Sequence, residues 1–213
     1  MITIQGKGVS TGIGMGPLYF YRRSSAEIRR YRPEDPQAEW ARFQAAQATA
    51  VDELGVLAEK AREEAGDDAA FLFETHQMMA EDLDFVEAIQ ALILEEGQNA
   101  EAAVSDTGEQ FSALFAAMDD DYMRERAADV KDVSARILRI LCGAAQSGMD
   151  TEVPVLLASA DLAPSEPIQL DKSKILGFVP ALGSGTSHTA ILARTLGIPS
   201  VVGLGDQLDA AFE

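Results

Sequence analysis

One short stretch of the sequence places a histidine directly after a turn of small residues. Gly183 and Gly185 allow positive φ angles and the close approach of another group, and Thr186 or Ser187 can cap a helix that starts near His188. The N-terminus of a helix offers free N–H donors and a partial positive charge, which favour a bound phosphate. A neutral imidazole offers a nitrogen lone pair for covalent catalysis. The pattern therefore indicates an anion site with a built-in nucleophile, which would form a phosphohistidine.

A structural role for His188 is the alternative interpretation. A histidine after a Gly/Ser turn can also cap a helix or fill a polar turn, and the spacing alone leaves both interpretations open.

Strands on either side of this histidine are expected to position it. The helix should run over 188–196 and stop at Gly197 and Pro199. Residues 153–157, 175–179 and 198–202 are strand candidates, as are 2–5 and 17–21 near the amino terminus. The strand, helix, strand order predicts a small α/β unit with His188 at the carboxyl end of a strand, where α/β proteins usually bind ligands.

The middle of the chain has the periodicity of helices. The first helix should start at Asp35-Pro36 and run to about residue 64, and two more should cover 68–80 and 84–96. Apolar stripes at helical spacing predict a fourth helix through Val104 and Phe111 and a fifth through Val130 and Ile137, the fifth capped by Asp119-Asp-Asp. We therefore expect an antiparallel bundle over 33–143, inserted into an α/β domain formed by 1–32 and 144–213.

Composition limits the classes of partner. The 213 residues are 47% hydrophobic, enough for a substantial core, and the formal net charge of −18 argues against nucleic acid or an anionic membrane as partner. A basic protein partner is favoured, although acidity can also serve solubility alone. A single cysteine, Cys142, and the absence of a signal peptide or an apolar span predict a cytoplasmic protein.

Several segments resemble one family of phosphoryl-transfer proteins. The stretch Thr186-Ser-His-Thr-Ala-Ile-Leu-Ala-Arg194, continued by Leu196-Gly-Ile-Pro-Ser-Val-Val-Gly203, is similar to the phosphohistidine signature shared by enzyme I of the phosphoenolpyruvate:sugar phosphotransferase system, pyruvate phosphate dikinase and phosphoenolpyruvate synthase. Residues 119–132, 73–82 and 8–16 resemble enzyme I in particular. The resemblance covers essentially the whole chain and disfavours a dikinase-like swivelling domain, because the dikinases do not share the 119–132 pattern.

The resemblance implies an architecture and a reaction. The fold would be a swivelling α/β phosphohistidine domain with an inserted all-helical domain that binds the small phosphocarrier protein HPr. His188 would attack the phosphorus of phosphoenolpyruvate through Nε2, release pyruvate and pass the phosphoryl group to a histidine of HPr. Thr186, Ser187 and the helix N-terminus would hold the phosphate, supported by Gly183 and Gly185.

The resemblance also implies a docking face for HPr on the helical domain. Acidic and apolar residues would form it: Asp67, Asp68, Met78, Met79, Asp82, Asp84, Phe85, Phe115, Met123 and, as a basic exception, Arg126. His76 lacks a glycine turn and a helix N-terminus, so we expect a structural role for it rather than a second phosphoacceptor site.

In members of this family, a barrel domain binds phosphoenolpyruvate and Mg²⁺ and forms the dimer contact. The resemblance does not extend to that domain within these 213 residues. The chain is therefore expected to be a monomeric fragment that holds no metal, exchanges phosphate with phospho-HPr and is not phosphorylated by phosphoenolpyruvate. Three departures from the family pattern surround His188: Ser184 and Gly185 replace a glycine and an arginine, and Pro167 replaces a threonine whose hydroxyl contacts the histidine. The alternative function is a non-catalytic module that binds HPr without transferring phosphate.

Overall fold

The protein divides into two compact units. The computed structural model describes residues 3–21, 28–144, 151–160, 162–163, 165–185, 187–205 and 207–210. One unit, the helical unit, comprises residues 25–62 and 67–146, and the other, the α/β unit, comprises 1–24, 63–66 and 147–213.

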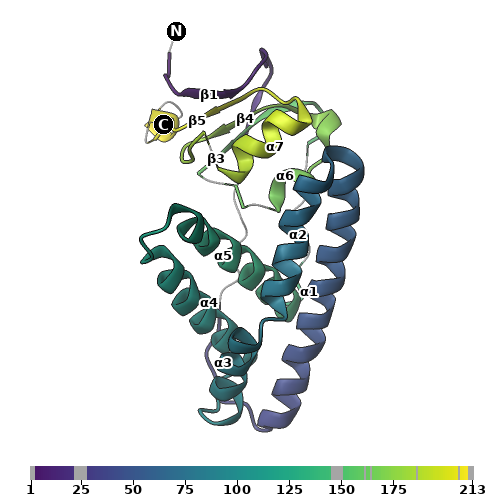
Figure 1. Ribbon diagram of the computed structural model, residues 1–213, viewed down its shortest axis with the longest axis vertical. Coiled ribbons are helices and arrows are strands. Elements are labelled where there is room, and N and C mark those ends of the chain that lie inside the picture. Colours follow the sequence, from purple (N-terminus) through teal and green to yellow (C-terminus); the bar gives the residue numbers. More distant parts are fainter. Residues whose placement is uncertain are drawn as a thin grey trace. The chain divides into compact units, whose positions relative to one another are not determined.

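Five helices account for most of the residues 36–141 (Figure 1). Their bounds are α1 Pro36–Ala65, α2 Asp67–Ala80, α3 Leu83–Leu94, α4 Ala100–Ala116 and α5 Asp121–Leu141. Side chains cap three of them: Asp35 Oδ1 accepts from Gln37 N and Ala38 N at the start of α1, Asp82 Oδ1 accepts from Phe85 N at the start of α3, and Asp120 Oδ1 accepts from Met123 N at the start of α5. Gly97, with φ of +72°, turns the chain after α3.

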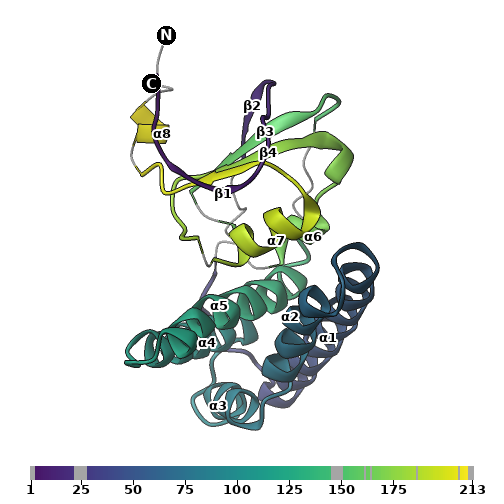
Figure 2. The ribbon, with the colours of Figure 1, turned by 45° about the horizontal axis from the view of Figure 1, so that its top comes forward.

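The helices of this unit pack as antiparallel neighbours around one apolar core, with α1 beside α2 and α4 beside α5 (Figure 2). Phe43 of α1, Ile89 of α3, Val104 of α4 and Ile137 of α5 are all fully buried in that core. Burying side chains of this size stabilises the fold by about 2 kcal/mol each. Two glutamines also join α1 to α2, because Gln47 Nε2 donates to Ala80 O at 2.7 Å and Gln77 Nε2 donates to Val51 O at 3.0 Å.

The α/β unit is built on a five-stranded mixed sheet with the strand order β1-β5-β4-β3-β2. Its strands are β1 Lys7–Ser10, β2 Leu18–Phe20, β3 Val155–Ser159, β4 Ile175–Pro180 and β5 Ser200–Val202. β2, β3, β4 and β5 run parallel, and β1 pairs antiparallel with β5 at one edge. Short segments and one longer helix complete the unit: α6 Glu166–Gln169, the 3₁₀ turn η1 Lys172–Lys174, α7 His188–Leu196 and α8 Gln207–Ala210.

Helix α7 lies over one face of this sheet (Figure 2). Ala193 of α7 packs in one cluster with Leu157 of β3 and Phe178 of β4, and Ala190 packs with Val9 of β1 and Val202 of β5. The helix therefore spans the strands that lead into and out of it, and the sheet fixes where its N-terminus lies.

The predicted architecture is confirmed, with one exception at the amino terminus. The helix expected from Pro36, the helix over 188–196 and the α/β unit with a helical insertion are all present. The strand expected over residues 2–5 is wrong for the residues that the structure describes: 3–6 form no strand, and β1 starts at Lys7. The sheet decides this register, because Lys7 and Gly8 are the residues that face Val202 and Val201 of β5.

Candidate active site

The N-terminus of α7 is capped by a side chain and follows a glycine-containing turn. Ser187 is its N-cap residue: its Oγ accepts from Ala190 N at 3.4 Å, and its carbonyl accepts from Ile191 N at 3.0 Å. This leaves the N–H groups of His188 and Thr189 outside the hydrogen bonding of the helix. The two donors and the helix dipole favour a negative charge at this point.

The turn that precedes α7 is held at several points. Gly183 has φ of +106°, a conformation that favours glycine, and Ser187 Oγ donates to Ser184 O at 3.0 Å. Arg194 reaches back from the last turn of α7, and its Nη1 donates to Gly185 O at 2.9 Å. The loop is therefore fixed by the helix that it introduces.

This turn lies at the carboxyl end of the parallel strands. Ala181 N, directly after β4, donates to Ser159 O at the end of β3 at 2.8 Å. α7 follows β4 and leads into β5 (Figure 1), so the helix, whose first residue is His188, is entered from the same edge of the sheet. Ligands of open α/β sheets bind at this edge.

Some of the expected site residues lie outside the described part of the structure. These are Thr186 and the side chains of His188 and Pro167. Gly183, Gly185 and Ser187 are described and form the turn and the helix cap.

Two negative findings apply to the described residues only. Among them, no three His, Cys, Asp or Glu side chains are grouped so that they could hold a metal ion. No helix in the described ranges is long and apolar enough to cross a membrane.

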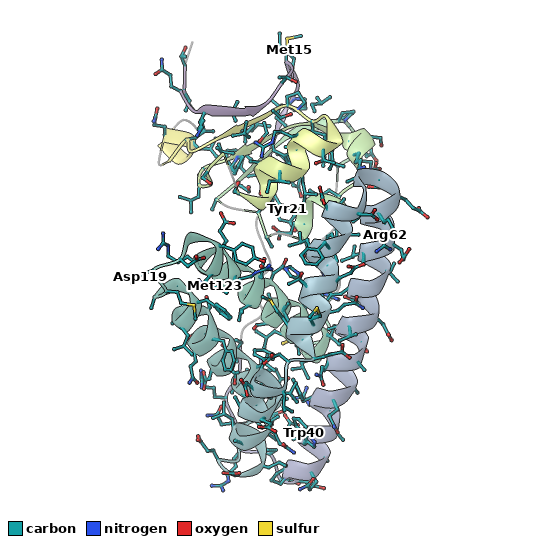
Figure 3. All side chains as sticks on the ribbon, viewed as in Figure 1. Met15, Tyr21, Trp40, Arg62, Asp119 and Met123 are labelled. Carbon is teal, nitrogen blue, oxygen red and sulfur yellow. The ribbon has the colours of Figure 1, made fainter. Side chains whose placement is uncertain are left out.

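The expected docking residues on the helical unit differ in exposure. Asp67, Asp68, Asp82 and Asp84 are exposed, and Met78 and Met123 expose 70% and 40% of their surface. Figure 3 shows Met123 at the α4–α5 end of the helical unit, near Asp119. Met79 and Phe115 are half-buried.

Phe85 does not fit the surface role expected for it. It is only 4% exposed and packs edge-on against Phe111 in the core, with ring centroids 5.6 Å apart. The physical reason is that α3 turns Phe85 toward Ile89 and Ile93, which lie four and eight residues further along the same buried face.

A buried ionic cluster joins α2 to α5. His76 is fully buried, with Nε2 3.1 Å from Asp129 Oδ1 and Nδ1 3.9 Å from Asp132 Oδ2. Arg126 Nη1 donates to Asp129 Oδ2 at 3.1 Å, and its guanidinium lies 4.6 Å from the centroid of the Tyr122 ring. These contacts agree with the structural role expected for His76, and they tie Arg126 to the surface of α5.

Phe71, which is not among the residues expected from the sequence, is 59% exposed on α2. It stands seven residues before Met78 and three after Asp68, so the three residues share one face of the helix. This spacing is the signal that could have identified it, since a large exposed aromatic side chain beside an exposed methionine marks a contact surface.

Comparisons with known proteins agree with this architecture. The family described as PEP-utilising enzyme, N-terminal, matches residues 5–126, and the family described as PEP-utilising enzyme, mobile domain, matches residues 151–212. The phosphoenolpyruvate-protein phosphotransferases of Bacillus sp. (strain S) and Bacillus subtilis (strain 168) are 38% and 35% identical over 203 and 211 residues. These alignments cover 94% and 95% of this chain but 35% and 36% of the relatives, so the chain spans about a third of their length.

Solved structures show the same likeness. A solution NMR structure of Enzyme I matches 96% of this chain and 84% of that chain, with a TM-score of 0.76 and 35% identity. The N-terminal domain of Enzyme 1 - Nitrogen matches 94% and 83%, with a TM-score of 0.66 and 25% identity. The chain therefore belongs to the PEP-utilising enzymes, whose N-terminal and mobile domains its two matched regions represent.

Proposed function

We propose that His188 accepts a phosphoryl group and exchanges it with HPr, in the first step of a phosphoenolpyruvate-dependent sugar phosphotransferase system. The observation that carries this proposal is the capped N-terminus of α7, where the N–H groups of His188 and Thr189 have no partner within the helix itself. Family membership supports it, since the curated relatives are phosphoenolpyruvate-protein phosphotransferases.

The proposed exchange moves one phosphoryl group between two imidazoles. The lone pair of a His188 ring nitrogen attacks phosphorus, the new N–P bond forms, and the N–P bond to the HPr histidine breaks. In the complete reaction the donor is phosphoenolpyruvate: its P–O bond breaks, and the enolate that leaves takes up a proton to become pyruvate. Because little covalent chemistry falls to the protein, positioning and charge stabilisation at the α7 N-terminus provide most of the catalysis.

Phosphoryl exchange with HPr tests the proposal. The chain is incubated with phospho-HPr, and the gain of one phosphoryl group is measured by mass spectrometry and located by fragmentation. We expect the group on His188 and no transfer to a His188→Gln variant that still binds HPr. Phosphoenolpyruvate alone should leave the chain unmodified. Binding of HPr without transfer to the wild-type chain would instead support the non-catalytic docking module.

We propose that HPr docks on the exposed face of α2 and the start of α5. Phe71 and Met78 provide an apolar centre on α2, Met123 extends it on α5, and Asp67 and Asp68 add negative charge at one end. An apolar centre with acidic neighbours suits a basic partner with an apolar patch. The buried cluster of His76, described above, would keep α2 and α5 in register for this contact.

Three single variants test the docking face. Phe71→Ser and Met78→Ser should each weaken HPr binding about tenfold, because exposed apolar anchors carry most of the energy of such an interface. Val56→Ser is the matched control, since Val56 is 70% exposed on α1 and outside the proposed face. Equal affinities for all three variants, measured by calorimetry, would remove α2 from the docking surface.

A further inference from the structure

A lysine from the edge strand β1 reaches the turn that precedes α7. A Cβ added at Gly185 would lie 3.1 Å from Lys7 Nζ and 3.4 Å from Lys7 Cε, so the end of this side chain occupies the space beside Gly185. The absence of a side chain at residue 185 is what makes room for it. Gly185 stands three residues before His188.

Lys7 begins the edge strand that packs beneath α7. It faces Val202 of β5 in the antiparallel pair, and Val9 packs with Val202 and Ala190 under α7. The register of the pair shifts between Gly8 and Ser10, so strict alternation along β1 does not set the direction of Lys7. The position of its Nζ and Cε beside Gly185 shows that the side chain points to the turn before α7.

The backbone of the turn also lies over this pair of strands. A Cβ at Gly183 would lie 3.7 Å from Val202 Cβ, which places Gly183 above the residue that Lys7 faces. Arg194 Nη1 donates to Gly185 O at 2.9 Å and is 3.4 Å from Val9 O. Two cationic side chains, from β1 and from α7, thus converge on the turn in a chain whose formal net charge is −18.

The two cationic side chains differ in their partners. Arg194 is engaged with backbone carbonyls, so it holds the turn. Lys7 is exposed, and in the part of the chain that the structure describes it forms no ion pair with a carboxylate. An ammonium group has three donors and can turn them to an arriving anion.

We propose that Lys7 binds the phosphoryl group at the N-terminus of α7 and stabilises its charge during transfer. This inference rests on the proposed function of His188. The Lys7 ammonium would donate to a phosphoryl oxygen, while the N–H groups of His188 and Thr189 donate from the helix side. Charge-assisted hydrogen bonds of this kind are about twice as strong as neutral ones.

The test removes the positive charge at residue 7 of β1 and then supplies a positive charge from residue 185 in the turn. Lys7→Met should slow phosphoryl transfer from phospho-HPr about tenfold, as expected for the loss of one charge-assisted hydrogen bond. Lys7→Arg should keep most of the rate. Adding Gly185→Arg to Lys7→Met should restore much of the lost rate. In the wild type Lys7 Nζ lies beside Gly185, so an arginine at residue 185 would bring a positive charge to the same region.

Two readouts separate this role from a structural one. The affinity for unphosphorylated HPr should be the same in the wild type and in Lys7→Met, and in ³¹P spectra the pH at which the bound phosphoryl group takes up a proton should be higher in the variant. Lys131→Met is the matched control for net charge, since Lys131 is exposed on α5, and it should transfer phosphate at the wild-type rate.

The outcomes distinguish the two proposals. A wild-type chain that is phosphorylated, with Lys7→Met equally fast, overturns the role of Lys7 and leaves that of His188 standing. If the wild type accepts no phosphoryl group, titration with inorganic phosphate decides, with chloride at equal ionic strength as reference. Amide signals of Gly183 and Gly185 that move in the wild type and stay still in Lys7→Met support the site. Signals that stay still in both overturn it.

Discussion

At the scale of single residues, two buried polar side chains of the helical unit contact partners from distant parts of the sequence, although His76 Nδ1 has no hydrogen-bond partner among the described residues. His76 lies between Asp129 and Asp132, more than 50 positions further along the chain. Glu39 of α1 accepts from Ala100 N at 2.6 Å and from Arg42, which also binds Glu101 of α4. Each of these groups joins two helices, so each should affect stability more than an exposed ion pair does.

Replacing His76 should destabilise the helical unit. We expect His76→Leu to lower the free energy of unfolding by about 3 kcal/mol, because Asp129 would remain buried with one partner fewer. Urea unfolding followed by circular dichroism measures this change. Glu74→Gln is the comparison, since Glu74 lies on the same helix with its side chain 44% exposed. A His76→Leu variant as stable as Glu74→Gln would mean that the cluster contributes little.

Acid should weaken the fold through Glu39 and Glu101. Burial raises the pKa of each carboxyl, but hydrogen bonds from Arg42, from Ala100 N to Glu39 and from Asn99 to Glu101 outweigh it and bring both pKa values below the usual 4.5. As the pH falls, Glu39 and Glu101 are therefore protonated at a higher pH in the unfolded chain than in the folded chain. The stabilisation is therefore complete above pH 4.5 and is lost as the pH falls through the lower folded values.

Unfolding free energies measured between pH 7 and pH 3 test this pair. Glu101→Gln should be less stable than the wild type at pH 7 and should lose less on acidification, so that the two curves converge. Stability curves of the two proteins that stay parallel would contradict the contribution of Glu101 to acid sensitivity.

At the scale of elements, α4 and α5 approach each other closely at one glycine. Gly108 of α4 lies against Ser134 of α5, and a Cβ at residue 108 would lie 2.8 Å from the Cβ of Ser134. Atoms cannot approach so closely, so the pair depends on the missing side chain. The glycine is here a requirement of packing, although it weakens the helix itself.

A double-mutant cycle measures this contact. Gly108→Ala should destabilise by about 2 kcal/mol, because α4 and α5 must separate. In a Ser134→Gly background the same substitution should cost less and can even stabilise, since alanine favours a helix by about 1 kcal/mol over glycine. Equal costs of Gly108→Ala in both backgrounds would rule out the clash as the cause.

The elements were predictable where the sequence itself specifies them. Pro36 after Asp35, Gly197 after the last turn of α7 and the apolar spacing of α1 gave the helices within a residue or two. β1 was misplaced, because its register is decided by β5, some 190 residues away. Phe85 was placed on the surface by the family resemblance, whereas α3 turns it into the core on the same side as Ile89 and Ile93.

The candidate site was likewise predictable only in part. The turn, the cap and the histidine are contiguous in sequence, so they could be recognised without a structure. Lys7 could not, because a lysine in a glycine-rich amino terminus has no signal of its own, and only the pairing of Lys7 with Val202 brings it to Gly185.

At the scale of the whole molecule, charge should control partner binding. With a formal net charge of −18 and exposed Asp67 and Asp68 on the proposed docking face, the affinity for HPr should fall about tenfold between about 0.02 M and about 0.5 M salt. Asp68→Asn should make this dependence shallower, and Asp35→Asn, which alters a cap at the start of α1, should not change its slope. An affinity that does not vary with salt would exclude electrostatic steering.

The pairing of β1 with β5 also sets an order of events during synthesis. β1 is complete after 10 residues, and its partner strand ends only at residue 202. At about 5–20 residues per second, the ribosome needs about ten to forty seconds to make the segment between them. All five helices of the helical unit emerge in that interval, so they can fold while β1 still has no partner. Lys7 is thus among the first residues to be made and among the last to reach its place.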